Sequence, residues 1–88
     1  MVRRRYADER RLGSNAGINV PVALGSEIDW EVYDLGGRWI GRGRIDLPET
    51  GDRRIQGQDL VGLAHGVYVL VLRGHPTVLP YVTRFVKE

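Results

Sequence analysis

The residue types that could carry out chemistry are few in this chain and far apart. His65 and His75 are its only histidines, the residue type best suited to proton transfer near neutral pH. Each precedes a glycine or a proline, with no histidine or carboxylate two or four residues away. Serine occurs only at Ser14 and Ser26, without the surroundings of a nucleophile elbow. We therefore expect two exposed turn histidines, no catalytic residue and a domain that is not an enzyme.

Metal and cofactor sites are not predicted either. The chain has no cysteine, and so no disulfide, no thiolate nucleophile and no zinc–thiolate site. Asp29 and Glu31 alternate with apolar residues, as on the solvated face of a strand. Gly36 and Gly37 fall in a predicted hairpin, whereas a phosphate-binding glycine motif stands before a helix. We expect no metal and no cofactor.

One cluster has the composition of a binding surface, namely Trp39 among Arg38, Arg42 and Arg44. Arginine over an indole ring gives a cation–π contact, and such a group could meet phosphate or an acidic sugar. Alternatively, Trp39 packs in the core and the arginine stems cover it. We favour packing, and keep the patch of Trp39, Arg42 and Arg44 as a candidate binding surface.

The most apolar segment, Val67–Leu72, has valine, leucine or tyrosine at every position. It is short, rich in β-branched residues and flanked by Gly66 and Gly74, which favours a strand over a buried helix. Because neither face carries a polar residue, we predict a central strand with both faces covered.

The loop before this strand contains Leu60, Leu63, Gly66 and Tyr68 at a spacing that resembles a tyrosine corner. In that motif a tyrosine at the start of a core strand bonds back to the loop that it has just left. A core tyrosine whose hydroxyl bonds water is the alternative, and we favour the corner.

Shorter apolar runs predict the remaining strands. In residues 27–33 strict alternation places Ile28, Trp30 and Val32 toward a core. Asp34–Gly37 predicts a hairpin loop, in which the aspartate caps the turn and the glycines supply positive φ. Further strands are expected at 18–24 (an edge strand or bulge, because of its proline), 38–45, 53–58 and 78–86. About six to seven short strands without a convincing helix predict an all-β antiparallel sandwich.

Charge separates a basic N-terminal segment from a nearly neutral remainder. Residues 1–11 carry five arginines against two acidic residues, whereas the other 77 residues carry eight basic and nine acidic residues. We expect residues 1–17 to form a basic flexible linker or arm and residues 18–88 to form the domain. An arm for nucleic acid would serve a basic domain, so no nucleic-acid partner is expected. No apolar run approaches the roughly 18–20 residues that span a bilayer, and no membrane insertion is expected.

Three segments together resemble the C-terminal sorting domain of proteins exported by the type IX secretion system (the Por secretion system sorting domain). They are Val32–Ile40, Asp59–Leu72 and Thr83–Glu88, in the family's order and at a similar spacing, and the match covers about residues 18–88. Where the family usually opens with an Asn-Pro motif, this chain has Asn15-Ala16-Gly17, which leaves the start of the domain open.

The resemblance implies an Ig-like sandwich with Greek-key connections at the end of a larger exported protein. Such domains direct their cargo from the periplasm across the outer membrane of Bacteroidetes-type bacteria. A surface sortase commonly removes them and joins the cargo to anionic lipopolysaccharide. The resemblance thus implies a non-catalytic sorting signal, an N-terminally fused cargo, protein partners in the secretion system and the sortase, and a secreted or cell-surface location. The recognition residues that it implies by position are Gly36, Gly37, Arg38, Gly66, Tyr68, Phe85, Val86 and Lys87.

A second interpretation is an Ig-like adhesion or glycan-binding accessory module of a secreted protein. In that case Trp39, Arg42 and Arg44 would bind the ligand, and the C-terminal strand would be dispensable.

Overall fold

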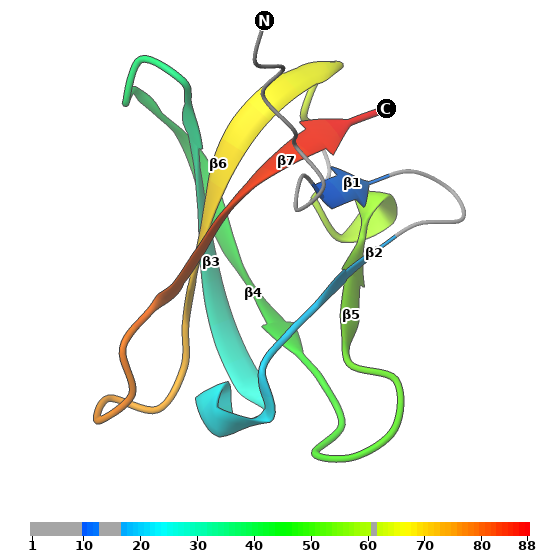
Figure 1. The fold of residues 1–88 in the computed structure, drawn as a ribbon, viewed down its shortest axis with the longest axis vertical. Helices are drawn as coiled ribbons and strands as arrows, with labels where there is room; N and C mark the ends of the chain where they lie inside the picture. The colour runs from blue at the N-terminus through cyan, green and yellow to red at the C-terminus, as the bar shows by residue number, and fades with distance from the viewer. Residues whose placement is uncertain (1–9, 13–16, 61) are drawn as a thin grey trace, which may run out of the picture.

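The computed structural model describes residues 10–12, 17–60 and 62–88, in which seven strands form two sheets (Figure 1). The larger sheet has the strand order β1-β7-β6-β3-β4, and the smaller sheet pairs β2 with β5. No helix in this part of the chain is long and apolar enough to cross a membrane. The strands are β1 (Arg10–Leu12), β2 (Gly17–Asn19), β3 (Glu27–Asp34), β4 (Trp39–Asp46), β5 (Arg54–Gln56), β6 (Gly66–Arg73) and β7 (Tyr81–Lys87), with 3-10 turns η1 (Val22–Leu24) and η2 (Gly57–Asp59).

The order of the strands is that of an immunoglobulin-type Greek key. In that fold the C, F and G strands form one sheet and the B and E strands the other. Here β3, β6 and β7 occupy the C, F and G places, β2 and β5 occupy the B and E places, and β4 extends the larger sheet beyond β3. The predicted all-β sandwich is confirmed. One pair departs from the prediction, because β1 runs parallel to β7.

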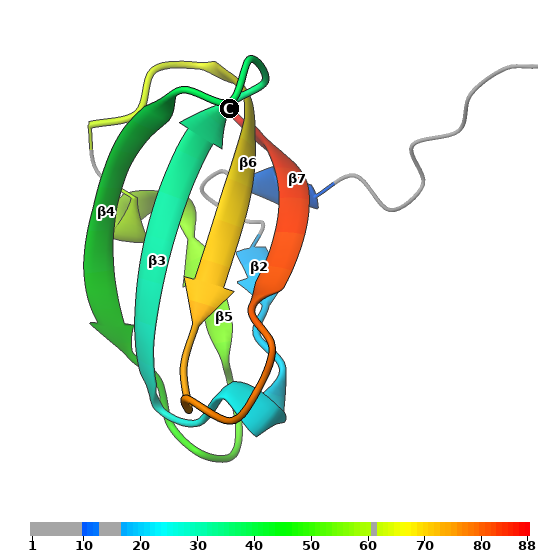
Figure 2. The ribbon, with the colours of Figure 1, turned by 90° about the vertical axis from the view of Figure 1, so that its left-hand side faces the viewer.

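The core lies between the two sheets. Ile28, Trp30 and Val32 of β3 are buried, as the alternation of that segment predicts. In β6, which lies in the middle of the larger sheet, Leu70 is fully buried, whereas Val69 is only half-buried. The prediction that both faces of this strand are covered holds only in part: on the outer face Val71 is buried and Val69 is half-buried, while the smaller sheet packs on the other face only (Figure 2).

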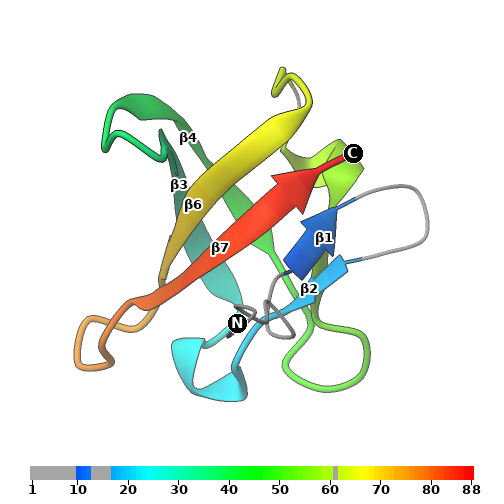
Figure 3. The same cartoon turned by 45° about the horizontal axis from the view of Figure 1, so that its top comes forward.

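The N-terminal boundary differs from the prediction of a linker over residues 1–17. Arg10–Leu12 forms β1, Leu12 is fully buried, and its carbonyl oxygen accepts a hydrogen bond of 2.9 Å from the amide of Glu88. Gly17 begins β2. Figure 3 shows β1 beside β7 and close to β2. Residues 1–9 and 13–16 lie outside the described residues, so the basic arm remains a prediction there.

Two of the predicted strands are shorter than expected. In residues 18–24, β2 ends at Asn19, and Pro21 leads into the turn η1. Proline has no N–H with which to continue a ladder, and its φ of −57° suits the start of a turn. The segment 53–58 forms a strand only over Arg54–Gln56, and η2 follows directly.

Arg53, one residue before β5, is a buried charged residue that joins its own β4–β5 loop to the β2–β3 loop. Its side chain is 6% exposed, and its guanidinium donates to four carbonyl oxygens. The donor–acceptor distances are 2.6 Å to Pro48, 2.8 Å to Gly25, 2.9 Å to Pro21 and 3.4 Å to Val20. The planar guanidinium suits this role because it presents several donors in fixed directions.

Two glycines allow close approaches within the sandwich. A Cβ atom on Gly43 of β4 would lie 2.6 Å from the ring of Trp30, so the indole packs directly on the backbone of β4. A Cβ atom on Gly74 would overlap the carbonyl oxygen of Leu24, which accepts a hydrogen bond from the amide of His75 at 3.1 Å. Both positions therefore require glycine for packing.

Candidate functional site

The three segments of the sorting-domain resemblance meet at one end of the larger sheet. In the strand register Asp34 lies opposite Tyr68, Tyr68 opposite Phe85, and Gly66 opposite Lys87. Figure 2 shows the β3–β4 hairpin, the start of β6 and the C-terminus at this end, and η1 with the β6–β7 turn at the other. We call the segments Asp34–Arg38, Gly66–Tyr68 and Phe85–Lys87 together the hairpin end.

The β3–β4 hairpin is held in one conformation by its first residue. The Asp34 Oδ1 atom accepts hydrogen bonds from the amides of Arg38 at 2.8 Å and Gly36 at 3.0 Å. Gly37 has a φ of 89°, which glycine adopts readily. The hydrogen bond from the amide of Arg38 is the main cause that holds the pKa of Asp34 below its usual value of 3.8. Desolvation of the carboxylate opposes this effect, and the hydrogen bond from the amide of Gly36 adds to it. The predicted capped hairpin is confirmed, with positive φ at Gly37 only among its two glycines.

Arg38 projects from this ordered loop into solvent. Its side chain is 82% exposed, and its Nε atom lies 3.5 Å from Asp34 Oδ2. The neighbouring Leu35 is 58% exposed. An exposed charged side chain and an exposed apolar side chain thus lie on one hydrogen-bonded turn, an arrangement that another protein can bind without first ordering the loop.

The loop before β6 forms the predicted tyrosine corner. The Tyr68 hydroxyl donates a hydrogen bond of 3.0 Å to the carbonyl oxygen of Ala64, in the loop that precedes the strand. Gly66, at a φ of 153°, lies under the Tyr68 ring: a Cβ atom there would be 3.5 Å from the hydroxyl. The corner is confirmed, and it fixes this loop to the start of β6.

The C-terminal segment belongs to the sheet and not to a loose tail. β7 is hydrogen-bonded to β6 on one side and to β1 on the other. Phe85 is fully buried, and its ring centroid lies 5.6 Å from that of Tyr68 at an interplanar angle of 31°. Val86 and Lys87 are half-buried. Phe85 is therefore a core residue that supports the hairpin end, and a folded domain does not present it to a partner.

The eight residues implied by the resemblance thus fall into three groups. Gly36, Gly37 and Arg38 are exposed, whereas Gly66 and Tyr68 are half-buried in the corner. The third group is the end of β7. There Val86 and Lys87 are half-buried, like the two residues of the corner, and Phe85 is fully buried.

A second group of candidate residues lies on β4, on the outer face of the larger sheet. Trp39 is 54% exposed and lies opposite Tyr33, and Arg42 lies opposite Glu31 on the same face. The preference for Trp39 as a core residue is wrong. A bulge between Val32 and Tyr33 leaves Ile40 as an extra residue on β4, which turns Trp39 to the outer face.

Among the arginines of this outer patch, Arg44 is already engaged. Its Nε atom lies 3.0 Å from Asp29 Oδ1, and this hydrogen bond is the main cause that raises the pKa of Arg44. Trp39 makes no ring or cation–π contact with another residue of the described ranges. The patch therefore offers a free indole face beside Arg42, which suits a flat or anionic ligand.

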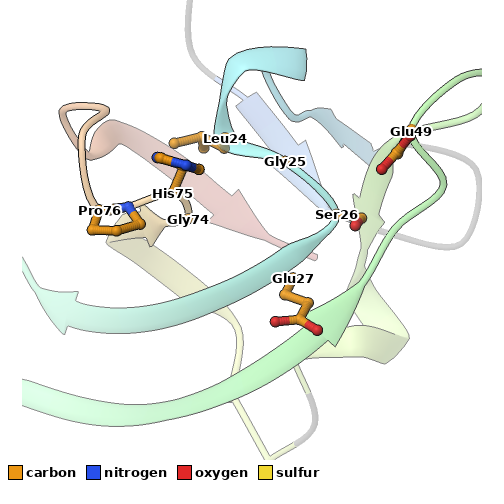
Figure 4. A pocket seen from close by; sticks show the side chains of 8 residues that line it. All are labelled: Leu24, Gly25, Ser26, Glu27, Glu49, Gly74, His75 and Pro76. Atoms are coloured by element: carbon orange, nitrogen blue, oxygen red, sulfur yellow. The ribbon is translucent and has the colours of Figure 1, made fainter.

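A pocket of about 340 Å³ lies at the opposite end of the sandwich from the hairpin end (Figure 4). His75 and the carboxylates Glu27 and Glu49 line it, together with Leu24, Gly25, Ser26, Gly74 and Pro76. The His75 Nδ1 atom lies 2.8 Å from the hydroxyl of Thr77, within its own turn. Over the described residues no three histidine, cysteine or acidic side chains are grouped to hold a metal ion. His65 and His75 are both exposed in turns, as predicted.

No family model, no curated protein and no solved structure matches this chain.

Proposed function

We propose that this chain is a non-catalytic sorting domain of the type IX secretion system, read by its partners at the hairpin end. In this proposal a cargo is fused to its N-terminus, and secretion-system proteins and a surface sortase are its partners. The cargo passes through the periplasm and ends at the cell surface or outside the cell.

One observation carries the proposal. Three short motifs, each weak alone and separated by at least ten residues of sequence, converge on one end of one sheet. The turn residues Leu35–Arg38 are exposed, and the Asp34 side chain orders the turn through two local hydrogen bonds to backbone amides. A recognition signal needs this combination of exposure and order.

The mode of recognition that fits this end is the reading of a rigid loop beside a strand terminus. Arg38 supplies an exposed charge, and Lys87 adds a second basic group at the end of β7. The tyrosine corner keeps the loop before β6 in place between them. A partner with an acidic surface would meet both charges without rearrangement of the domain.

The test is export of a folded reporter that carries the whole chain, residues 1–88, at its C-terminus in a type IX-competent cell. The chain must include β1, because Leu12 belongs to the core and pairs with the end of β7. We expect the reporter at the cell surface or in the medium, and the reporter without the domain in the periplasm. Equal retention of both in the periplasm would refute the proposal. Deletion of Phe85–Glu88 is unsuitable as a test, since it removes a core residue along with the signal.

A second candidate function, glycan binding, is favoured by the exposure of Trp39. An indole that is 54% exposed beside Arg42 is a common arrangement for stacking on a sugar ring with an acidic substituent. Binding of the domain to an array of acidic glycans, lost in Trp39→Ala while the variant stays folded, would support this function. Export that is unchanged in the same variant would show that the two functions are separate.

A further inference from the structure

The outer edge of β4 is an open strand edge. β4 is the last strand of the larger sheet, and Figure 2 shows it at the margin of the sandwich. The amide of Leu47 donates to the carbonyl oxygen of Ser26, so this pair is hydrogen-bonded, and such pairs alternate along an antiparallel ladder. The backbone groups of Arg42, Arg44 and Asp46 therefore point away from β3. Within the described ranges no other strand or loop bonds to them.

The charged side chains on this edge are unequally engaged. Arg44 is paired with Asp29 at 3.0 Å. Arg42 and Asp46 are both exposed, and neither side chain forms a hydrogen bond or an ion pair with a described residue. Arg42 and Asp46 carry opposite charges, lie on the same face and are equally distant from Arg44 along the strand.

We propose that β4 pairs with β4 of a second copy of this chain, antiparallel and centred on Arg44. Two-fold symmetry then places Arg42 opposite Asp46 of the second copy, and Asp46 opposite Arg42 of the second copy. Arg44 lies opposite Arg44 of the second copy, and each of these two arginines is paired with Asp29 of its own chain. These three residues carry the outward backbone groups, so their pairs exchange roughly six main-chain hydrogen bonds. The two unpaired charges of each copy become two ion pairs across the interface.

The inner face of the edge is complementary in size at the same register. Gly43 lies opposite Ile45 of the second copy, and Ile45 opposite Gly43 of the second copy. Gly43 has no side chain, and the Trp30 ring lies against it. Ile45 is half-buried and packs on the core of its own copy. In the dimer the Ile45 side chain of each copy packs beside Gly43 of the other copy, next to the Trp30 ring that lies against that glycine.

Neighbouring symmetric registers are less favourable. A dimer centred on Gly43 places Arg42 opposite Arg44 of the second copy twice over, and so brings four arginines together. A dimer centred on Ile45 pairs Arg44 with Asp46 of the second copy, but it places Arg42 opposite Pro48, which lies beyond the strand and has no N–H to donate. That register therefore forms fewer main-chain hydrogen bonds and leaves Arg42 without an acidic partner. An acidic peptide could pair with Arg42 and Arg44, but it would face Asp46 with like charge. The opposite charges of Arg42 and Asp46 on one edge therefore favour a second copy of the chain as the partner. This inference does not depend on the proposed sorting function.

The test is sedimentation velocity of the full chain from about 10 μM to about 1 mM, a range suited to the weak association expected of a small interface. We expect a dimer fraction that rises with concentration. Arg42→Asp and Asp46→Arg each turn two attractive contacts into two repulsive ones, so each should raise the dissociation constant by about tenfold or more. An equimolar mixture of these two variants should dimerise again, because both cross-pairs then join opposite charges.

Glu49→Arg is the matched control, because it changes the net charge as Asp46→Arg does but lies beyond β4. It should associate like the unmodified chain. Far-UV circular dichroism and the thermal midpoint check that every variant is folded. In amide hydrogen exchange, the amides of Arg42, Arg44 and Asp46 should gain protection as concentration rises. A chain that is monomeric at the highest concentration would overturn the proposal, which would leave the edge to a different partner. Unchanged dimers in both single variants, or no recovery in their mixture, would overturn it equally.

Discussion

The sharpest test of the fold is Arg53→Lys, which keeps the charge but removes the planar guanidinium. Arg53 donates to four carbonyl oxygens from two loops, and three of these bonds are 2.9 Å or shorter. The single ammonium of a lysine cannot reach carbonyl groups that lie in different directions, so at least two bonds are lost. Hydrogen bonds that involve a charged group contribute about 1.5–3 kcal/mol each, which gives an expected loss of about 3 kcal/mol or more.

That loss is large for a chain of this size. A domain of 88 residues has a free energy of unfolding of about 4–13 kcal/mol. A loss of 3 kcal/mol corresponds to a fall in thermal midpoint of about 12–24 °C for a domain of 60–100 residues. Urea titration and thermal scans followed by circular dichroism measure both quantities.

The control for this prediction is the next residue in the chain. Arg54 is exposed and pairs with Asp52 through bonds of 2.8 and 3.1 Å, so Arg54→Lys tests the same substitution in solvent. Exposed ion pairs contribute little, and we expect a change of about 0.5 kcal/mol or less. Equal effects of the two substitutions, or a change below about 1 kcal/mol for Arg53→Lys, would refute the role assigned to Arg53.

Three further predictions concern the sheet and the hairpin end. Gly43→Ala should lower the free energy of unfolding by about 1–3 kcal/mol through overpacking, whereas Gly41→Ala, with open space around it, should change it little; similar values would contradict the packing described. Tyr68→Phe should cost about 1 kcal/mol by loss of the corner bond, and Tyr81→Phe, whose hydroxyl bonds no described residue, should cost nothing measurable. Because the pKa of Asp34 is lowered in the folded chain, the native chain should have a larger free energy of unfolding than Asp34→Asn above the ordinary pKa of 3.8. This difference should vanish as the pH falls through the lower pKa of the folded state. Urea titrations at pH 7 and about pH 2 measure it, and a difference that persists in acid would refute the role of the Asp34 charge.

The parts of the fold that were predictable from sequence are those set by local patterns. Strict alternation over 27–33 assigned Ile28, Trp30 and Val32 to the core because side chains on a strand alternate whatever its neighbours are. The capped hairpin at Asp34 and the corner at Tyr68 were also predictable, since each is a bond between residues four apart in sequence or fewer.

What could not be predicted depends on residues that are distant in sequence. β1 has three residues, two of them arginines, and its pairing exists only because the edge of β7 is available. Trp39 would face inward with Gly41 and Gly43 if β4 alternated strictly, but the bulge at Ile40 reverses it. The bonds of Arg53 reach residues up to 33 positions away, and no local pattern distinguishes it from Arg54.

The same contrast between local patterns and contacts distant in sequence holds for the two candidate surfaces. The resemblance singled out three segments of the sequence, but their meeting at one end is a property of the strand register. The free edge of β4 and the unpaired charges of Arg42 and Asp46 could be recognised only once the order of strands was known. No signal in the sequence marks a strand as the last in its sheet.

The measurement that tests the central proposal most directly is the exported fraction of a reporter fused to the chain with Arg38→Glu, compared with Arg54→Glu. Both arginines are exposed, and both pair with a nearby aspartate, but only Arg38 lies at the hairpin end. The proposal predicts that Arg38→Glu retains the reporter in the periplasm while the domain stays folded, and that Arg54→Glu leaves export unchanged. Normal export of the Arg38→Glu fusion, or equal loss in both, would contradict recognition at the hairpin end.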